Sequence, residues 1–169
     1  MGADYWAPAL GWGGVAAAGV GGVLIVVLVV APFAFLSDYP EDIRRAAHAP
    51  TPGQRRAGVT GGIVFMIVLL ASLGAVVFSW GMTHPGAGFF ELALMAMVAI
   101  ILFVLVDLLV VDWLVICTWR PRAILVPGTE HCAGWRDRSH HFREQFRPRG
   151  LIVLLAGSGL LGLAARWLT

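Results

Sequence analysis

Four long apolar segments dominate this chain and limit what it can fold into. A helix needs about 20 mostly apolar residues to cross the hydrocarbon core of a bilayer. The segments that meet this requirement are residues 13–36, 58–82, 89–118 and 151–167. Only helices and closed barrels satisfy their backbone in lipid, and no segment alternates apolar and polar residues as a barrel strand does. We therefore predict four membrane-spanning helices.

The composition agrees with this prediction. Hydrophobic residues make up 59% of the chain and charged residues 13%, whereas a soluble domain has roughly 45–50% and about 25%. This excludes a soluble enzyme, a disordered chain and a nucleic-acid-binding module. The predicted fold class is all-α, an integral membrane four-helix bundle, and residues 1–169 form a single transmembrane domain. Its expected partners are membrane lipids and, in one alternative, a second copy of the chain. We expect no nucleic-acid partner.

The arginines predict which way the bundle faces. Every basic residue is an arginine, and eleven of the twelve lie in two connectors, residues 37–57 and 119–149. The positive-inside rule places both connectors in the cytoplasm. Both termini and the turn at 83–88 then lie outside. The first span lacks a basic leader and is too long for a cleaved signal, so we expect it to remain uncleaved.

Small and aromatic residues predict details of helix packing. Gly14, Ala18 and Gly22 are spaced four apart, as are Ser158 and Gly162. Such ladders let helices approach closely in lipid, although glycine and alanine are also simply common in membrane helices. Tryptophans near the span ends predict belts at the two membrane surfaces. These are Trp6, Trp12 and Trp80 outside, and Trp119 and Trp135 inside.

The first connector contains a helix-start pattern. Asp38 and Glu41 have the spacing of a capping box, and Pro40 suits the first helical turn. The pattern predicts a short helix at the membrane surface. A solvated charged loop is the alternative.

The second connector, between helices 3 and 4, is predicted to be a structured cytoplasmic loop. An apolar run at 123–126 lies between two prolines, too short to span the membrane. The basic segment 136–147 carries Phe142 and Phe146 four residues apart. That spacing suits a helix lying on an anionic membrane surface.

Part of the chain resembles a family of small bacterial four-span membrane proteins without a characterised function. The resemblance implies the four-span layout and a location in the bacterial inner membrane, and it transfers no activity, cofactor or catalytic residue. The residues that carry it are Asp38-Tyr39-Pro40, Asp107, Asp112-Trp113, Pro127-Gly128-Thr129-Glu130, Gly134, Asp137 and His141-Phe142-Arg143.

Asp107 and Asp112 are the sharpest chemical signal. A carboxylate inside a span costs about 2.5–3.5 kcal/mol on insertion scales, so such residues usually face the bundle interior and serve a function. Five residues turn an α-helix by about 140°, so the two are expected on two walls of one cavity opening to the cytoplasm. The alternative is that each only pairs with a loop arginine or histidine to fix the fold.

Polar residues of the second connector should face the same cavity. With the two aspartates, Glu130 and His141 form a candidate acid–base set, so the predicted catalytic residues are Asp107, Asp112, Glu130 and His141. Asp107, Asp112, His131 and His141 are the candidate metal ligands, and a divalent metal is the candidate cofactor. Their spacing matches no recognised metal motif.

Arginine presents a rigid fork that suits phosphate and carboxylate groups. We therefore predict Arg120, Arg122, Arg143 and Trp113 as substrate-binding residues. The alternative is that membrane topology alone accounts for the arginines.

These residues favour a small membrane-embedded enzyme. It would modify a lipid or isoprenoid-like substrate at the cytoplasmic side, with the aspartates as acid–base groups or metal ligands. The alternatives are a proton- or ion-coupled transport protein and a non-catalytic partner or assembly subunit.

Overall fold

The computed structural model describes residues 2–169, and four of its helical segments are long and apolar enough to cross a membrane. These segments are Asp4–Val30, Pro52–Thr83, Phe89–Trp119 and Pro148–Leu168. The protein is thus an all-α bundle, as predicted. The elements in chain order are α1 (Ala3–Val30), η1 (Leu36–Asp38), α2 (Glu41–Ala46), α3 (Pro52–Thr83), α4 (Phe89–Val106), η2 (Asp107–Trp119), η3 (Arg122–Ile124), η4 (Ala133–Arg136), α5 (Arg138–Gln145) and α6 (Pro148–Leu168).

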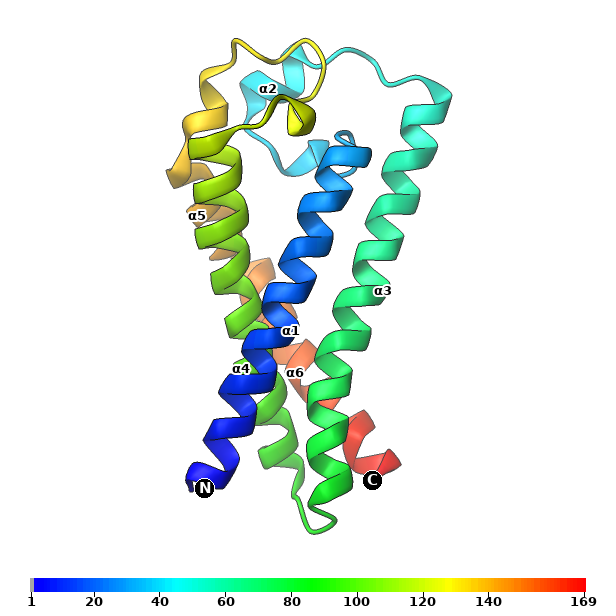
Figure 1. Ribbon diagram of the computed structural model, residues 1–169, viewed down its shortest axis with the longest axis vertical. Helices are drawn as coiled ribbons and strands as arrows, with labels where there is room; N and C mark the ends of the chain where they lie inside the picture. Colours follow the sequence, from blue (N-terminus) through cyan, green and yellow to red (C-terminus); the bar gives the residue numbers. More distant parts are fainter. Residues whose placement is uncertain (1) are drawn as a thin grey trace.

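The helices place both connectors at one end of the molecule and both termini at the other. Figure 1 shows the N-terminus, the C-terminus and the turn between α3 and α4 together at the bottom, and α2 at the top. We name these the terminal end and the connector end. The arginine-rich segments therefore share one end.

The first span differs from its predicted bounds. It begins before residue 13 and ends at Val30 instead of residue 36. Pro32 explains the early end, because a proline disfavours the helical conformation of the residue before it. Ala31 accordingly leaves the helix, with φ −141° and ψ 65°.

The capping box forms in a different place from the one predicted. α2 begins at Glu41 after Pro40, without a side-chain cap, so the predicted Asp38–Glu41 box is wrong. Instead, Thr51 Oγ1 accepts from the backbone N–H of Gln54 at 3.3 Å, and Gln54 Oε1 accepts from that of Thr51 at 2.9 Å. This reciprocal pair starts α3 at Pro52.

Small residues hold α4 against its neighbours, in a register only partly predicted. Gly162 is buried, and a methyl group built there would lie 2.6 Å from the backbone nitrogen of Ala93. The ladder on α6 is therefore a real contact. On α1, however, Gly14 and Gly22 have open space around them. The buried ladder lies one residue earlier, at Ala9, Gly13, Ala17 and Gly21.

The second connector packs into the protein. Trp135 is 1% exposed, and its Nε1 donates to the backbone oxygen of Thr129 at 2.9 Å. The backbone N–H of Gly134 donates to the Asp42 carboxylate at 2.8 Å, which joins the two connectors. Trp135 is thus a core residue instead of part of a belt, as is Trp80 at the terminal end.

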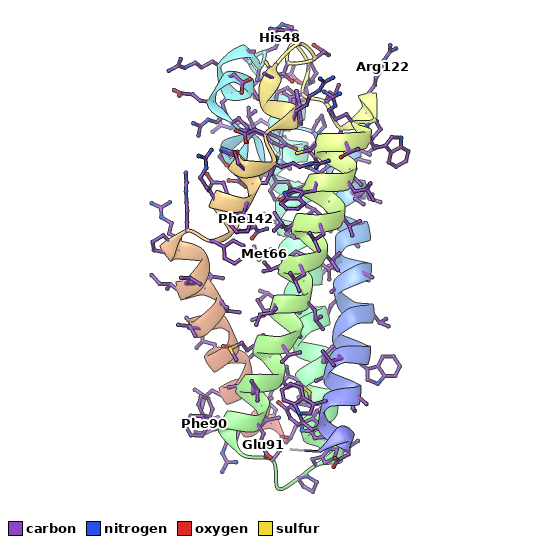
Figure 2. The ribbon with its side chains drawn as sticks, turned by 90° about the vertical axis from the view of Figure 1, so that its left-hand side faces the viewer. His48, Met66, Phe90, Glu91, Arg122 and Phe142 are labelled. Atoms are coloured by element: carbon purple, nitrogen blue, oxygen red, sulfur yellow. The ribbon has the colours of Figure 1, made fainter. Side chains whose placement is uncertain are left out.

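A helix forms within the predicted segment 136–147, as α5, and it packs against η2 through the buried His141 while Phe142 and Phe146 stay exposed. Figure 2 shows Phe142 of α5 at about the height of Met66 on α3, well below His48 at the connector end. The chain therefore turns back along the third span before α6 begins. This brings polar residues of α5 to the level of the spans.

Candidate functional site

The third span changes its helix type at Asp107. It is α-helical to Val106 and a π-helix over Asp107–Trp119. The wider winding is visible in the bond from the Arg120 N–H to the Val115 oxygen at 2.7 Å, five residues back. Thr118 Oγ1 also reaches five residues back, donating to the Trp113 oxygen at 2.6 Å.

This winding changes how the two aspartates are related. The hydrogen bonds of a π-helix run five residues back, so five residues make slightly more than one turn, and Asp107 and Asp112 lie on nearly the same side of η2. The expected separation of about 140°, which holds for an α-helix, is therefore wrong. Both carboxylates now lie on one wall of a single cavity.

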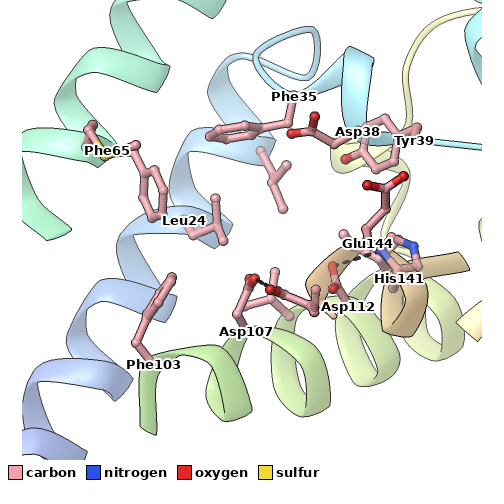
Figure 3. Close-up of a pocket in the computed structure, with 15 residues that line it drawn as sticks. Leu24, Phe35, Asp38, Tyr39, Phe65, Phe103, Asp107, Asp112, His141 and Glu144 are labelled. Atoms are coloured by element: carbon pink, nitrogen blue, oxygen red, sulfur yellow. Dashed lines mark hydrogen bonds and ion pairs between the residues drawn. The ribbon is translucent and has the colours of Figure 1, made fainter. Parts of the chain in front are cut away.

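The cavity has a volume of about 380 Å³ and lies between α1, α3, η2 and α5. This is within the range of about 300–1,000 Å³ that is typical of ligand pockets. Figure 3 shows its two halves, with aromatic and aliphatic side chains on one side and carboxylates and His141 on the other. The apolar half is made by Leu24, Leu28, Phe35, Phe65, Met66, Phe103, Val111 and Ile116, and the polar half by Asp38, Tyr39, Asp107, Asp112, His141, Glu144 and Gln145.

Asp112 and His141 form a buried pair in the polar half. His141 Nδ1 lies 3.1 Å from Asp112 Oδ1, and the side chains are 8% and 13% exposed. Burial, the largest single influence, favours the neutral imidazole, but the hydrogen bonds and charge interactions with Asp112 and Cys117 together outweigh it and raise the pKa of His141 from 6.5 to about 10. His141 is therefore an imidazolium at neutral pH, held beside the Asp112 side chain.

Asp107 lies below this pair and has a neutral partner. Gln145 Nε2 of α5 donates to Asp107 Oδ2. Within residues 2–169, no arginine or histidine forms an ion pair with Asp107. Asp107 is thus a buried carboxyl group whose direct partner in the described structure is a neutral amide.

Three further polar groups surround the upper part of the cavity. Glu144 pairs with Arg147 at 2.8 Å, whereas Asp38 is exposed. The Tyr39 hydroxyl is buried without a hydrogen-bond partner in the described structure. Burial, and after it the carboxylates of Asp112 and Asp38, raise the pKa of Tyr39 far above its usual value of 10. Tyr39 therefore stays protonated and is able to donate to a ligand.

The structure brings together only part of the predicted catalytic set. Asp107, Asp112 and His141 line one cavity, but Glu130 is exposed and lines a separate pocket at the connector end. His131 is also exposed and lies outside the cavity lining. In the chain from residue 2 onward, no three His, Cys, Asp or Glu side chains are grouped to hold a metal ion. The predicted metal set is therefore not assembled.

The predicted substrate-binding residues also lie outside this cavity. Arg120 and Arg122 border the pocket of Glu130, and Arg143 lies near Asp137 at 3.9 Å. Trp113 is covered by the guanidinium of Arg138, 5.9 Å from the ring centroid.

Four polar lining residues escaped the sequence-based prediction of the site, namely Asp38, Tyr39, Glu144 and Gln145. A signal existed for one of them. Gln145 follows His141 by four residues, so a helix there places both on one face.

No family model, no curated protein and no solved structure matches the chain. The site must therefore be interpreted from its own geometry.

Proposed function

We propose that the cavity binds a cationic amphiphile, a molecule with an apolar body and a positively charged end, in exchange for a proton at Asp107. Such an exchange would make the protein an ion-coupled transport protein. The observation that carries the proposal is the Asp107 carboxylate, which lies in a membrane-spanning helix without a cationic partner among residues 2–169. A charge in such a place is stabilised by an opposite charge or neutralised by a proton.

The charges around the cavity favour a cation over an anion. Asp112 is paired with His141 and Glu144 with Arg147, whereas Asp107 and Asp38 form no ion pair within residues 2–169. The arginines predicted to hold an anionic substrate do not line the cavity. An anionic headgroup would therefore meet net negative charge.

The aromatic residues of the apolar half support the same conclusion. Phe35 and Phe65 pack edge to face with centroids 5.6 Å apart, and Phe103 continues the row at 6.1 Å from Phe65. Aromatic faces attract cations when water is excluded, and they also provide apolar area for a hydrocarbon or aryl body.

Three amphiphiles with one alkyl chain test the proposal: dodecyltrimethylammonium, dodecyl maltoside and dodecyl sulfate. Binding is measured by calorimetry to the protein in nanodiscs of zwitterionic lipid. We expect the cation to bind best, and Asp107→Asn to weaken it by about 2 kcal/mol or more, with proton release that the variant lacks.

Glu41→Gln is the matched control. It removes one carboxylate at the connector end, outside the cavity, where Glu41 pairs only with Arg45. Equal affinity for the three amphiphiles, or an equal loss in both variants, would overturn the proposal.

An acid–base enzyme is the second candidate function. It is favoured by the free Tyr39 hydroxyl, which shares the cavity with the Asp112–His141 pair and is able to act as a proton donor. Incubation with a bacterial lipid extract, analysed by mass spectrometry, tests this function. A lipid product lost in both Tyr39→Phe and Asp107→Asn would favour the enzyme, whereas cation binding without any product would favour transport.

We also propose that the connector end faces the cytoplasm of a bacterial cell, since the two connectors hold eleven of the twelve arginines. A cysteine at Gly86, in the turn of the terminal end, should react with a membrane-impermeant thiol reagent on intact cells. A cysteine at Arg45 should react only after permeabilisation. The opposite pattern would reverse the orientation.

A further inference from the structure

A second pocket lies at the connector end, where the third span leaves the membrane. It has a volume of about 480 Å³ and is separate from the cavity of Asp107. Its lining is basic and aromatic, in contrast to the acidic cavity. The lining residues are Trp119, Arg120, Arg122, Leu125, Glu130, Trp135 and Arg136.

The side chains of the three arginines in this pocket form no ion pair within residues 2–169. Across residues 2–169, the arginine ion pairs are made by Arg45, Arg143 and Arg147 instead. Glu130 also borders the pocket, but its Oε1 accepts from the backbone N–H of Gly128 at 3.3 Å. The pocket therefore keeps an excess of positive charge.

Arg120 shows the clearest sign of an unmet interaction. Its Nε atom is buried without a hydrogen-bond partner in the described structure. Its φ of 46° is also the one positive φ among the described non-glycine residues. This left-handed conformation ends the third span, as is common at the C-terminus of a helix.

The pocket is built on a rigid base. Ile124 of η3 is fully buried beside Arg122, and Trp135 precedes Arg136 and is held by Thr129. The arginines thus project from anchored backbone. Figure 2 shows Arg122 at the connector end, extending away from the body of the protein.

The position of the pocket at the end of the third span indicates its ligand. Trp119 is the last residue of the third span and is 72% exposed, as expected for an aromatic residue among lipid headgroups. Arginine forks bind phosphate oxygens in pairs. We propose that this pocket binds a phosphate group, supplied by an anionic phospholipid of the adjacent leaflet.

Native mass spectrometry of the detergent-solubilised protein, titrated with phosphatidylglycerol or phosphatidylcholine, tests the proposal. We expect phosphatidylglycerol to bind more tightly, and Arg122→Gln with Arg136→Gln to weaken it roughly tenfold or more. Both side chains are exposed, so the fold should survive, which a thermal unfolding curve verifies.

The matched control is Arg55→Gln with Arg56→Gln, which removes the same charge from exposed positions at the start of α3. Inorganic phosphate forms a third arm. If it binds alone and competes with the lipid, the site is a phosphate site that also accepts the free ion. An equal loss in both double variants, or equal binding of the two lipids with no phosphate binding, would overturn the proposal.

Discussion

The Asp112–His141 pair allows a quantitative test of the polar half of the cavity. The nitrogen and oxygen are 3.1 Å apart, a separation worth about 5 kcal/mol at an effective dielectric constant near 20 before desolvation is subtracted. Desolvation removes much of this, so the net coupling between the two side chains should be about 1.5–3 kcal/mol. A double-mutant cycle of Asp112→Asn, His141→Phe and the double variant measures it.

The coupling should depend on pH in a defined direction. The pKa of His141 is raised from 6.5 to about 10, so the folded protein holds this proton more tightly than the unfolded chain does. The contribution of protonated His141 to the free energy of unfolding is therefore complete below pH 6.5 and declines as the pH rises toward 10. Asp112→Asn should abolish this dependence.

Equilibrium unfolding in mixed detergent micelles, followed by circular dichroism at several pH values, provides the measurement. The His140–Glu144 pair is an internal control, because its atoms are 3.9 Å apart and its side chains are 19% and 30% exposed. It should show a coupling of about 0–1 kcal/mol. A coupling for Asp112 and His141 no larger than this, or one unchanged from pH 6 to about pH 10, would refute the assignment of a buried ion pair.

Two further predictions concern packing and thiol chemistry. Gly162→Ala should lower the free energy of unfolding by about 1–3 kcal/mol, since the new methyl group would meet the backbone of Ala93. Gly159→Ala on the same helix places its methyl group in open space and should be neutral or stabilising. Equal effects of the two substitutions in thermal unfolding would contradict the close contact. Burial and two neighbouring carboxylates raise the pKa of Cys132, so its alkylation at neutral pH should be much slower in the folded protein than in denaturant. Peptide mass spectrometry measures this rate, and rapid labelling of the folded chain would contradict the packing of the second connector.

The layout of the bundle was predictable because it depends on long-range averages of the sequence. Hydropathy locates the spans, and the arginine count places two connectors at one end. Span ends depend on single residues instead. Pro32 ends the first span early, and Thr51 with Gln54 starts the second.

Packing details were less predictable, since they depend on which side of a helix faces its neighbour. Two small-residue ladders run along α1, and each allows close approach. The ladder that includes Gly13 faces Ala99 of α4, while Gly14 has open space. Apolar residues occur all around the helix, so hydropathy does not distinguish the two faces.

The site itself depends on the π-helix, a feature that hydropathy does not encode. Asp107 and Asp112 were recognisable as intramembrane acids, but an α-helical third span would have placed them on different walls. Because the π-helical η2 makes only slightly more than one turn in five residues, both carboxylates lie toward α5, where His141 meets one and Gln145 the other. The unequal partners then give the acids different chemistry. The carboxylate of Asp112 is balanced by an imidazolium, whereas that of Asp107 is left for a proton or a cationic ligand.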